Sequence, residues 1–218
     1  MLKRKLIFDD YDTAVHFWTL ASWSCPTPEP VTNLVEVPGR LDGPLDFSTA
    51  LTGDLRYGSR PLEVRLESSE GTRLERQARI DDMINKLHGQ RVSIWLPDDS
   101  SRYLVGRLNI QQEYNDQAHA AVVVTATCEP WRYDNEETEF SVTVQESTPQ
   151  TVTLVNDRRP VCPMADVSGE VRVEHNGVSV ALGEGHYKLP DIILTPGENT
   201  IQVTGSGTVT FIYRKAVL

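Results

Sequence analysis

The sequence predicts a mainly β protein with one amphipathic helix, divided into two domains at residues 1–133 and 134–218. Thirteen prolines and fourteen glycines punctuate the 218 residues, and strand-like runs recur between them at short intervals. One segment, residues 72–89, instead repeats its apolar residues at helical spacing. The polar, acidic run at residues 134–139 separates two strand-rich parts, so we place the domain boundary in front of it.

The N-terminal part is expected to begin with a strand at residues 3–8, followed by an irregular stretch. Prolines at positions 26, 28 and 30 exclude a helix or a central strand from residues 26–30. We therefore expect an extended arm or edge segment there.

Residues 37–53 are expected to form a turn-rich connection or a contact surface. Three glycines and two prolines set turns in this segment, with an arginine and two aspartates between them. The segment contains no nucleophile paired with a base and no phosphate-binding pattern. Gly43 is the position at which a positive φ would exclude a β-branched residue.

Residues 72–89 carry the start and stop signals of a helix. Thr72 and Glu75 form the Thr-x-x-Glu pattern of a capping box, and Gly89 directly after His88 is typical of a C-terminal stop. The apolar residues form one stripe, which predicts that one face packs on a sheet. They are Leu74, Ala78, Ile80, Ile84 and Leu87.

Two hairpins are predicted after the helix. Residues 92–96 turn at residues 97–100 into a strand at 103–108, and a second turn at residues 115–116 leads into a strand at 118–128. The run at residues 120–124 is continuously apolar, so we expect this strand to be buried on both faces or to lie partly in an interface.

The C-terminal part contains strands alone and is expected to be a small antiparallel sandwich. Asn176-Gly177 is the strongest two-residue hairpin signal, and folding about it pairs Val173 with Val180 and Val171 with Leu182. Residues 195–198, Thr-Pro-Gly-Glu, are typical of a type II turn.

Charge and composition exclude several functions. The net charge is −10: residues 1–133 carry 15 basic against 19 acidic residues, or −4, and residues 134–218 carry 6 against 12, or −6. A chain this acidic is not expected to grip nucleic acid specifically by its phosphates. No apolar run approaches the ~20 residues of a membrane span, and the apolar stretch at residues 6–8 is too short for a signal peptide, so we expect synthesis in a cytoplasm.

No catalytic, cofactor or metal site is expected. The three cysteines, Cys25, Cys128 and Cys162, have no CxxC spacing and are expected to be buried reduced thiols. The five histidines lack metal-ligand spacing and are expected at the surface or at helix ends. The carboxylate pairs at residues 81–82 and 98–99 are explained by helix solvation and turn chemistry.

A carbohydrate-binding module is the alternative that the C-terminal sandwich leaves open. Sugars stack on exposed aromatic rings, and Tyr187 is the one loop candidate for such a glycan contact in that half of the chain. A glycan hydrolase is a remote third possibility, because its two carboxylates could come together from separate elements.

Several short motifs occur in a defined order along nearly the whole chain, and their order and spacing carry more information than any one of them. Together they resemble the distal tail protein, or tail-tip hub, of long-tailed non-contractile bacteriophages or prophages. Leu41 interrupts the Arg-Asp-Gly of that family. The motifs are Val37–Arg40, Asp42–Gly43, Leu45–Asp46, Leu51–Gly53, Tyr57, Arg60, Leu87–Gly89, Asp98–Asp99, Tyr103, Gly106–Arg107, Cys128–Tyr133, Pro190–Ile192, Pro196–Ile201, Gly207–Phe211 and Tyr213–Arg214.

This resemblance implies an N-terminal β-sandwich with one helix and a projecting hairpin, and a galectin-like C-terminal β-sandwich. It implies a structural virion protein at the tail tip, made in the bacterial host cytoplasm, without enzymatic activity. The N-terminal domain is expected to form a homohexameric ring that connects the tail tube to tail-tip and receptor-binding proteins. An acidic protein suits such a conduit, because it repels the phosphates of passing DNA.

A ring needs arms or edges that pair with neighbouring copies. The candidate segments are residues 26–30, the loop at 37–53 and the turn near 97–102. The candidate assembly contacts are Pro28, Pro30, Gly39, Arg40, Asp42, Gly43, Asp46, Asp98 and Asp99.

Overall fold

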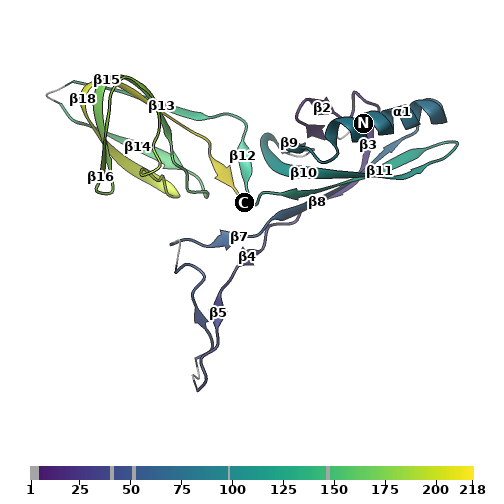
Figure 1. The fold of residues 1–218 in the computed structure, drawn as a ribbon, viewed down its shortest axis with the longest axis horizontal. Coiled ribbons are helices and arrows are strands. Elements are labelled where there is room, and N and C mark those ends of the chain that lie inside the picture. The colour runs from purple at the N-terminus through teal and green to yellow at the C-terminus, as the bar shows by residue number, and fades with distance from the viewer. Residues whose placement is uncertain (1–4, 40–41, 51–52, 98, 146–147) are drawn as a thin grey trace. The chain divides into compact units, whose positions relative to one another are not determined.

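The computed structural model describes residues 5–39, 42–50, 53–97, 99–145 and 148–218. The chain forms two compact units, the first running to Arg132 and including Leu218, and the second spanning Tyr133–Val217. In both units the described elements are strands, with the exception of one α-helix in the first (Figure 1). The predicted mainly β fold class with a single helix is confirmed.

The first unit is built on an antiparallel sheet in the order β2-β1-β9-β10-β11-β8-β3. Each strand of this sheet pairs antiparallel with its neighbours, and β10 with β11 forms the longest hairpin, shifted by a bulge between Gln112 and Tyr114. The bounds are β1 (Ile7–Phe8), β2 (Tyr11–Asp12), β3 (Thr19–Ser24), β8 (Arg60–Ser68), β9 (Arg91–Leu96), β10 (Asp99–Asn115) and β11 (Ala120–Cys128).

Helix α1 (Arg73–Leu87) packs on one face of this sheet. The predicted capping box is present: the Thr72 hydroxyl accepts from the Glu75 main-chain N–H, and the Glu75 carboxylate accepts from the Thr72 N–H. Ile80 is fully buried against the sheet, as the apolar stripe predicts. Leu74 is 82% exposed and Ala78 is also exposed, so their places in that stripe are wrong. The buried face of the helix is formed by Arg76, Ile80, Met83 and Leu87.

Arg76 takes the buried place that an apolar residue would be expected to hold, and is 1% exposed. Its guanidinium donates to the main-chain oxygens of Gly71, Asp116 and Gln117. The arginine therefore satisfies carbonyl groups of two loops at once, which compensates for its burial.

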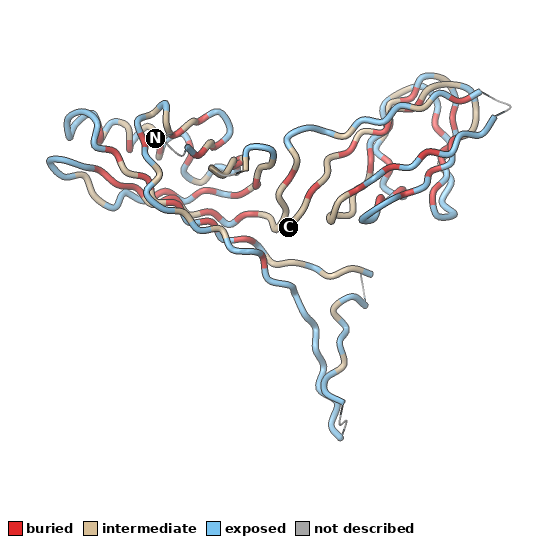
Figure 2. Tube along the Cα trace, turned by 180° about the vertical axis from the view of Figure 1, so that it is seen from behind, coloured by how far each residue is buried: buried red, intermediate tan, exposed pale blue. Residues whose placement is uncertain are grey.

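Strand β11 is buried on both faces over residues 120–122, whereas Val123, Thr125 and Thr127 on its second face are half-buried or exposed, so the prediction of a strand buried on both faces holds only for its first residues. Residues 120, 121, 122 and 124 are fully buried, while Val123 is half-buried. The strand lies between β10 and β8 in the sheet, and Figure 2 shows the buried residues following these strands.

The prediction that no regular structure follows the first strand is wrong, because β3 pairs with β8 at the edge of the sheet. Its residues are mostly exposed or half-buried, so the apolar period that marks a central strand is missing. The partner β8 supplies the pairing, and that partner lies forty residues further along the chain.

An extended arm, which we define as residues 26–59, leaves the sheet between β3 and β8 (Figure 1). It consists of two short antiparallel pairs, one of β4 with β7 and one of β5 with β6. The arm expected from the prolines is therefore present. The bounds are β4 (Pro30–Val31), β5 (Leu34–Val35), β6 (Leu45–Asp46) and β7 (Arg56–Tyr57).

The second unit is an antiparallel assembly in the order β13-β18-β15-β16, with β14 on β18 and β17 on β15. The predicted Asn-Gly hairpin is confirmed, since Val171 pairs with Leu182 and Val173 with Val180. The bounds are β12 (Arg132–Asp134), β13 (Thr138–Val144), β14 (Gln150–Asn156), β15 (Met164–His175), β16 (Val178–Leu182), β17 (Gly185–Lys188), β18 (Gly197–Tyr213) and β19 (Ala216–Val217).

Strands β15 and β18 pair antiparallel from Met164–Ile212 to Glu174–Gln202 and carry three glycines near the middle of this pairing. Gly169, Gly205 and Gly207 all have positive φ, at 101°, 110° and 154°. A Cβ at Gly207 would lie 2.1 Å from the main-chain oxygen of Ser168. These glycines allow the two paired backbones to approach closely.

Candidate functional site

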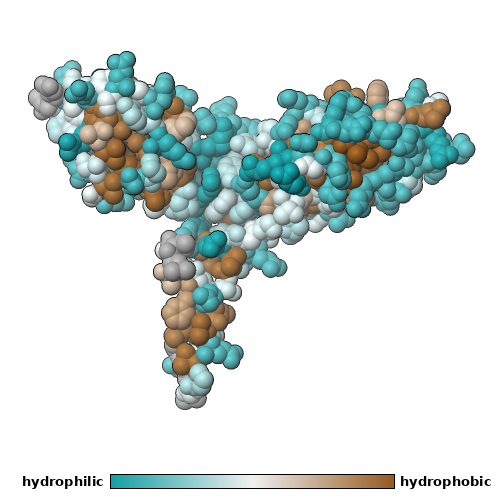
Figure 3. Space-filling view, viewed as in Figure 1, coloured by the Kyte–Doolittle hydropathy of each residue, from teal (hydrophilic) through white to brown (hydrophobic). Residues whose placement is uncertain are grey.

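The arm is the most unusual surface of the first unit, because it exposes apolar side chains instead of burying them. Five large apolar residues are 42–55% exposed there, and Figure 3 shows them gathered along the arm in brown. An apolar group of this kind typically marks an interaction surface. The residues are Val31, Leu34, Val35, Val37 and Phe47.

Local hydrogen bonds hold the arm in shape. The main-chain N–H of Phe47 donates to the oxygen of Asn33, and the N–H of Asn33 donates to the Ser48 hydroxyl. The Asp46 carboxylate accepts from the Ser48 hydroxyl and N–H, and these bonds lower the pKa of Asp46. These hydrogen bonds define the hairpin geometry of the described part of the arm, whose large apolar side chains are exposed.

Most of the described candidate assembly contacts lie exposed on the arm. Pro30, Gly39, Asp42, Gly43 and Asp46 are all exposed. Gly43 has φ +83°, in the region that favours glycine, so the turn that it forms depends on the missing side chain.

Four of the candidate contacts differ from this group, namely Pro28, Arg40, Asp98 and Asp99. Pro28 is buried, so its ring fixes the path of the arm and is not presented on the surface. Arg40 and Asp98 lie outside the described residues. Whether any of the nine candidates touches a neighbouring copy stays a prediction.

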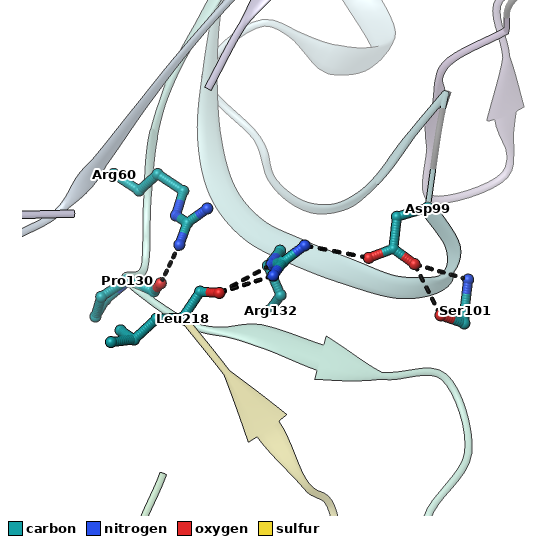
Figure 4. Close-up of polar contacts among 6 residues, drawn as sticks. All are labelled: Arg60, Asp99, Ser101, Pro130, Arg132 and Leu218. Atoms are coloured by element: carbon teal, nitrogen blue, oxygen red, sulfur yellow. Dashed lines mark hydrogen bonds and ion pairs between the residues drawn. The ribbon is translucent and has the colours of Figure 1, made fainter. Parts of the chain in front are cut away.

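Asp99 lies at the start of β10 and joins a polar cluster with Arg132 (Figure 4). One carboxylate oxygen of Asp99 accepts from the Ser101 hydroxyl at 2.7 Å, and the other lies 3.4 Å from Nη1 of Arg132. Arg132 also donates two hydrogen bonds to the main-chain oxygen of Leu218. The sequence motifs contain both Asp99 and Arg132, but nothing in their spacing indicated that they pair.

Near this cluster, Arg60 is 5% exposed and donates to the main-chain oxygen of Pro130 at 3.2 Å.

Burial raises the pKa of Cys128 to about 12, and burial also raises the pKa of Cys25, although Arg60 partly opposes this shift. Both thiols are therefore protonated near neutral pH, as expected for structural cysteines.

The face of the sheet that α1 leaves open is polar. Residues on β8, β10 and β11 that alternate with buried ones point to this face, and a depression of about 460 Å³ lies over them. Arg65 on this face is paired with Glu67 and with Glu113. The face carries acid and base together and is not a basic track.

An apolar groove of about 430 Å³ lies at the other margin of the sheet, where β1 pairs with β9. Its walls are Ile7, Trp95, Leu96 and Pro97, and its rim carries Lys5, Asp9 and Ser100. Ile7 and Trp95 are directly opposite in the β1–β9 register. The sequence indicated the strand in which Trp95 lies, but not this pocket.

In the second unit, Tyr187 is half-buried and packs against the core. Its hydroxyl donates to the main-chain oxygen of Glu184 at 3.4 Å. The predicted glycan contact therefore offers only part of its ring to a ligand, and the prediction stays untested.

His175 is 5% exposed, so the expectation that all five histidines lie at the surface or at helix ends is wrong. Its Nδ1 lies 2.9 Å from the main-chain oxygen of Thr200, and its Nε2 lies 3.2 Å from that of Ile193. Packing of β15 against the segments before and along β18 creates this site. No local pattern marks it.

Among the described residues, no group of three or more His, Cys, Asp or Glu side chains is placed to bind a metal ion. In the same part of the chain, α1 is too short and too polar to cross a lipid bilayer.

No protein-family model matches this sequence. No curated protein matches it either. Among solved structures, the chain is similar to the crystal structure of Dit (gp 19.1) of SPP1, described as a paradigm of hub adsorption apparatus in Gram-positive infecting phages. The similarity covers 98% of this chain and 99% of the other, with a TM-score of 0.72 and 16% sequence identity.

The chain has the Dit fold. The mainly β fold with β-sandwich domains that the resemblance implies is therefore confirmed, while the galectin-like character of the second domain stays a prediction. The similarity extends over almost the full length of both chains, so the Dit fold accounts for the first unit and the second.

Proposed function

We propose that this protein is a structural hub of a phage tail. In this proposal, copies of the chain form a ring, expected to be a hexamer, that joins the tail tube to tail-tip and host-adsorption proteins. The observation that carries the proposal is the match of both units to the Dit fold. The protein acts by joining other proteins and performs no catalysis.

The exposed apolar arm supports self-assembly. An isolated soluble chain would leave Leu34, Val35 and Phe47 in water, and burying them against another copy would contribute ~25 cal/mol for each Å² of apolar surface removed. The arm leaves the sheet between two of its strands, and its described residues make hydrogen bonds with one another. It is suited to reach a neighbour.

The polar open face of the sheet supports a role as a conduit for DNA. Arg65 is paired with Glu67 and Glu113, and Arg107, which lines the depression on this face together with Glu63, donates to the main-chain oxygen of Gly89, so the face offers few free cations to phosphates. DNA that passes such a surface is not held by counterion release and can slide.

Two measurements test the hub proposal. Native mass spectrometry of the purified chain over a concentration series is expected to give a closed oligomer near six copies. Immunogold labelling of phage particles that carry this protein is expected to place gold at the tail tip. A chain that stays monomeric together with unlabelled particles would rule out the hub.

The carbohydrate-binding alternative has its own test. Addition of a panel of mono- and disaccharides is expected to leave the NMR signals around Tyr187 unchanged. Saturable shifts confined to the strands that flank Tyr187 would favour a glycan-binding function for the second unit.

A further inference from the structure

Strand β16 forms a free edge of the second unit. It ends the order β13-β18-β15-β16, and among the described strands it pairs only with β15 (Figure 1). The turn that joins the two strands has positive φ at Asn176 and Gly177, 50° and 81°, as in a type I′ turn. Such a turn closes on a hydrogen-bonded pair, and bonded and non-bonded pairs then alternate along the hairpin. The main-chain N–H and C=O groups of Ser179 and Ala181 therefore point away from β15, toward the free edge.

This edge lacks the features that usually prevent another strand from pairing. Strand β16 reads Val-Ser-Val-Ala-Leu, without charge or proline, and its register with β15 contains no bulge. Other edge strands are protected: β3 has a bulge in its pairing with β8, and β13 carries Glu139. On β14 the main-chain oxygen of Val155 already accepts from the Tyr213 hydroxyl at 2.8 Å. Strand β16 is therefore more open to strand addition than these three.

The two faces of β16 offer different surfaces to an added strand. On the inner face, Val178 is 37% exposed and Val180 is partly buried against the core, so apolar contact is available there. On the outer face, Ser179 and Ala181 are small and exposed, and a depression of about 400 Å³ lies beside Ala181. A long side chain of an added strand can therefore cross β16 on this face and reach β15.

The outer face is acidic. Glu170 and Glu174 on β15 and Glu184 after β16 are exposed, against one exposed base, Arg172, so three acidic residues and one basic give −2. Within the described part of the chain, none of these four side chains makes an ion pair. An added strand lies two strand spacings from β15, or about 10 Å, which a lysine and a glutamate side chain can span together.

The same charges select the kind of partner. Residues 134–218 carry a net charge of −6, so a second copy would bring like charges to this edge. A basic strand would instead be attracted to it.

We propose that the free edge of β16 binds an extended segment of another protein, in which basic residues alternate with apolar ones. The segment pairs with the main chain of Ser179 and Ala181, its apolar residues cover Val178, and its basic residues face Glu174. This inference rests on the hub function proposed above, because it names one way in which the second unit takes hold of a protein that the hub joins.

Hydrogen exchange of the full-length chain, followed by NMR, tests the pairing. The probe is a synthetic peptide in which lysine and valine alternate and which is long enough to cover the five residues of β16. Saturable binding is expected to slow the exchange of the Ser179 and Ala181 amides, because strand addition takes both N–H groups out of water. Binding is expected to weaken as salt is added. The control peptide, with glutamate in place of lysine, is expected not to bind.

Two pairs of variants locate the site. Ala181→Pro removes an edge N–H that β15 does not use, so the hairpin is expected to remain and peptide binding to be lost. Ala181→Ser keeps this N–H and is expected to bind as the unaltered chain does. Glu174→Gln leaves the main chain intact and is expected to weaken binding several-fold, which keeps the test valid if the proline variant unfolds. Its control is Glu198→Gln, at an exposed position where β18 pairs with β14.

The outcomes separate this inference from the proposed function. Absence of saturable binding, or binding that leaves the exchange of Ser179 and Ala181 unchanged, would overturn the β16 site, and a closed oligomer in the same sample would leave the hub standing. Slow exchange of these amides in the concentrated chain alone would show that a second copy takes the edge, against the proposal. A chain that binds the peptide as expected, but stays monomeric beside unlabelled particles, would overturn the hub and keep the strand-binding edge.

Discussion

The guanidinium of Arg132 donates two hydrogen bonds, of 3.2 and 2.8 Å, to the main-chain oxygen of Leu218, which lies 86 residues later. Arg132 is the last residue of the first unit before the chain enters the second, and Leu218 belongs to the first unit again. One side chain thus ties together the two points at which the chain leaves the first unit and returns to it.

Replacing Arg132 by Ala is expected to lower the free energy of unfolding of the first unit by about 2 kcal/mol, since it removes two charge-assisted hydrogen bonds. Loss of the partly exposed ion pair between Arg132 and Asp99 is expected to lower the free energy of unfolding by less than about 1 kcal/mol more. All four tryptophans, at positions 18, 23, 95 and 131, belong to the first unit, so urea unfolding followed by tryptophan fluorescence measures the loss. The exposed Arg73, replaced by Ala, is the control, and equal midpoints for both variants would contradict this role.

Gly207→Ala is expected to destabilise the second unit by about 3 kcal/mol, because its Cβ would clash with the main-chain oxygen of Ser168. Far-ultraviolet circular dichroism is expected to show an early transition, while tryptophan fluorescence keeps the midpoint of the unaltered chain. Gly183→Ala is the matched control: its Cβ meets nothing closer than 3.9 Å, and its effect is expected to stay within about 0.5 kcal/mol. An early fluorescence transition for Gly207→Ala would contradict independent unfolding of the units.

The capping box of α1 predicts a pH dependence. The main-chain and hydroxyl bonds from Thr72 lower the pKa of Glu75 below its ordinary value of 4.5. Since the folded-state pKa is depressed, the stabilisation is complete above pH 4.5 and is lost as the pH falls through the folded value. Thr72→Ala removes the hydroxyl bond and keeps the main-chain bond, so it is expected to move the NMR titration midpoint of Glu75 part of the way toward 4.5 and to cost about 1 kcal/mol of stability. An unchanged midpoint would show that the Thr72 hydroxyl does not lower the pKa of Glu75.

Gly43→Val is expected to disturb assembly more than folding. The positive φ of Gly43 costs a side-chain-bearing residue roughly 1–2 kcal/mol, yet a Cβ there meets nothing within 4 Å, so the effect is confined to the backbone of the arm. Light scattering is expected to show loss of the oligomer, with unchanged cooperativity of unfolding. Gly58→Ala, at ordinary φ and 3.6 Å from the nearest atom, is expected to do neither. Misfolding of the whole chain would show that the arm belongs to the core.

Local sequence signals were sufficient to predict an element where the residues that interact in it are close to one another in the sequence. Thr72 with Glu75 gave the start of α1, and Asn176-Gly177 gave the register of the β15–β16 hairpin. In each case the bonded groups are only a few residues apart, so the sequence contains the whole interaction.

Long-range packing explains what the sequence did not reveal. Strand β3 is held by β8, and its own residues lack a buried period. His175 is buried by segments around residues 193 and 200. The hydrogen bonds between Arg132 and Leu218 join two residues that the whole second unit separates in the sequence. The groove likewise exists because β1 meets β9 across more than eighty residues.

By itself, the sequence determined the mainly β class, the single helix and the exposed, proline-punctuated arm, because backbone conformation and capping depend on adjacent residues. The tertiary structure alone decided which strands meet, which polar side chains are buried, and that the arm and the groove occupy opposite margins of one sheet. Those features arise from contacts between distant segments, whose pairing is selected by the free energy of packing the whole unit.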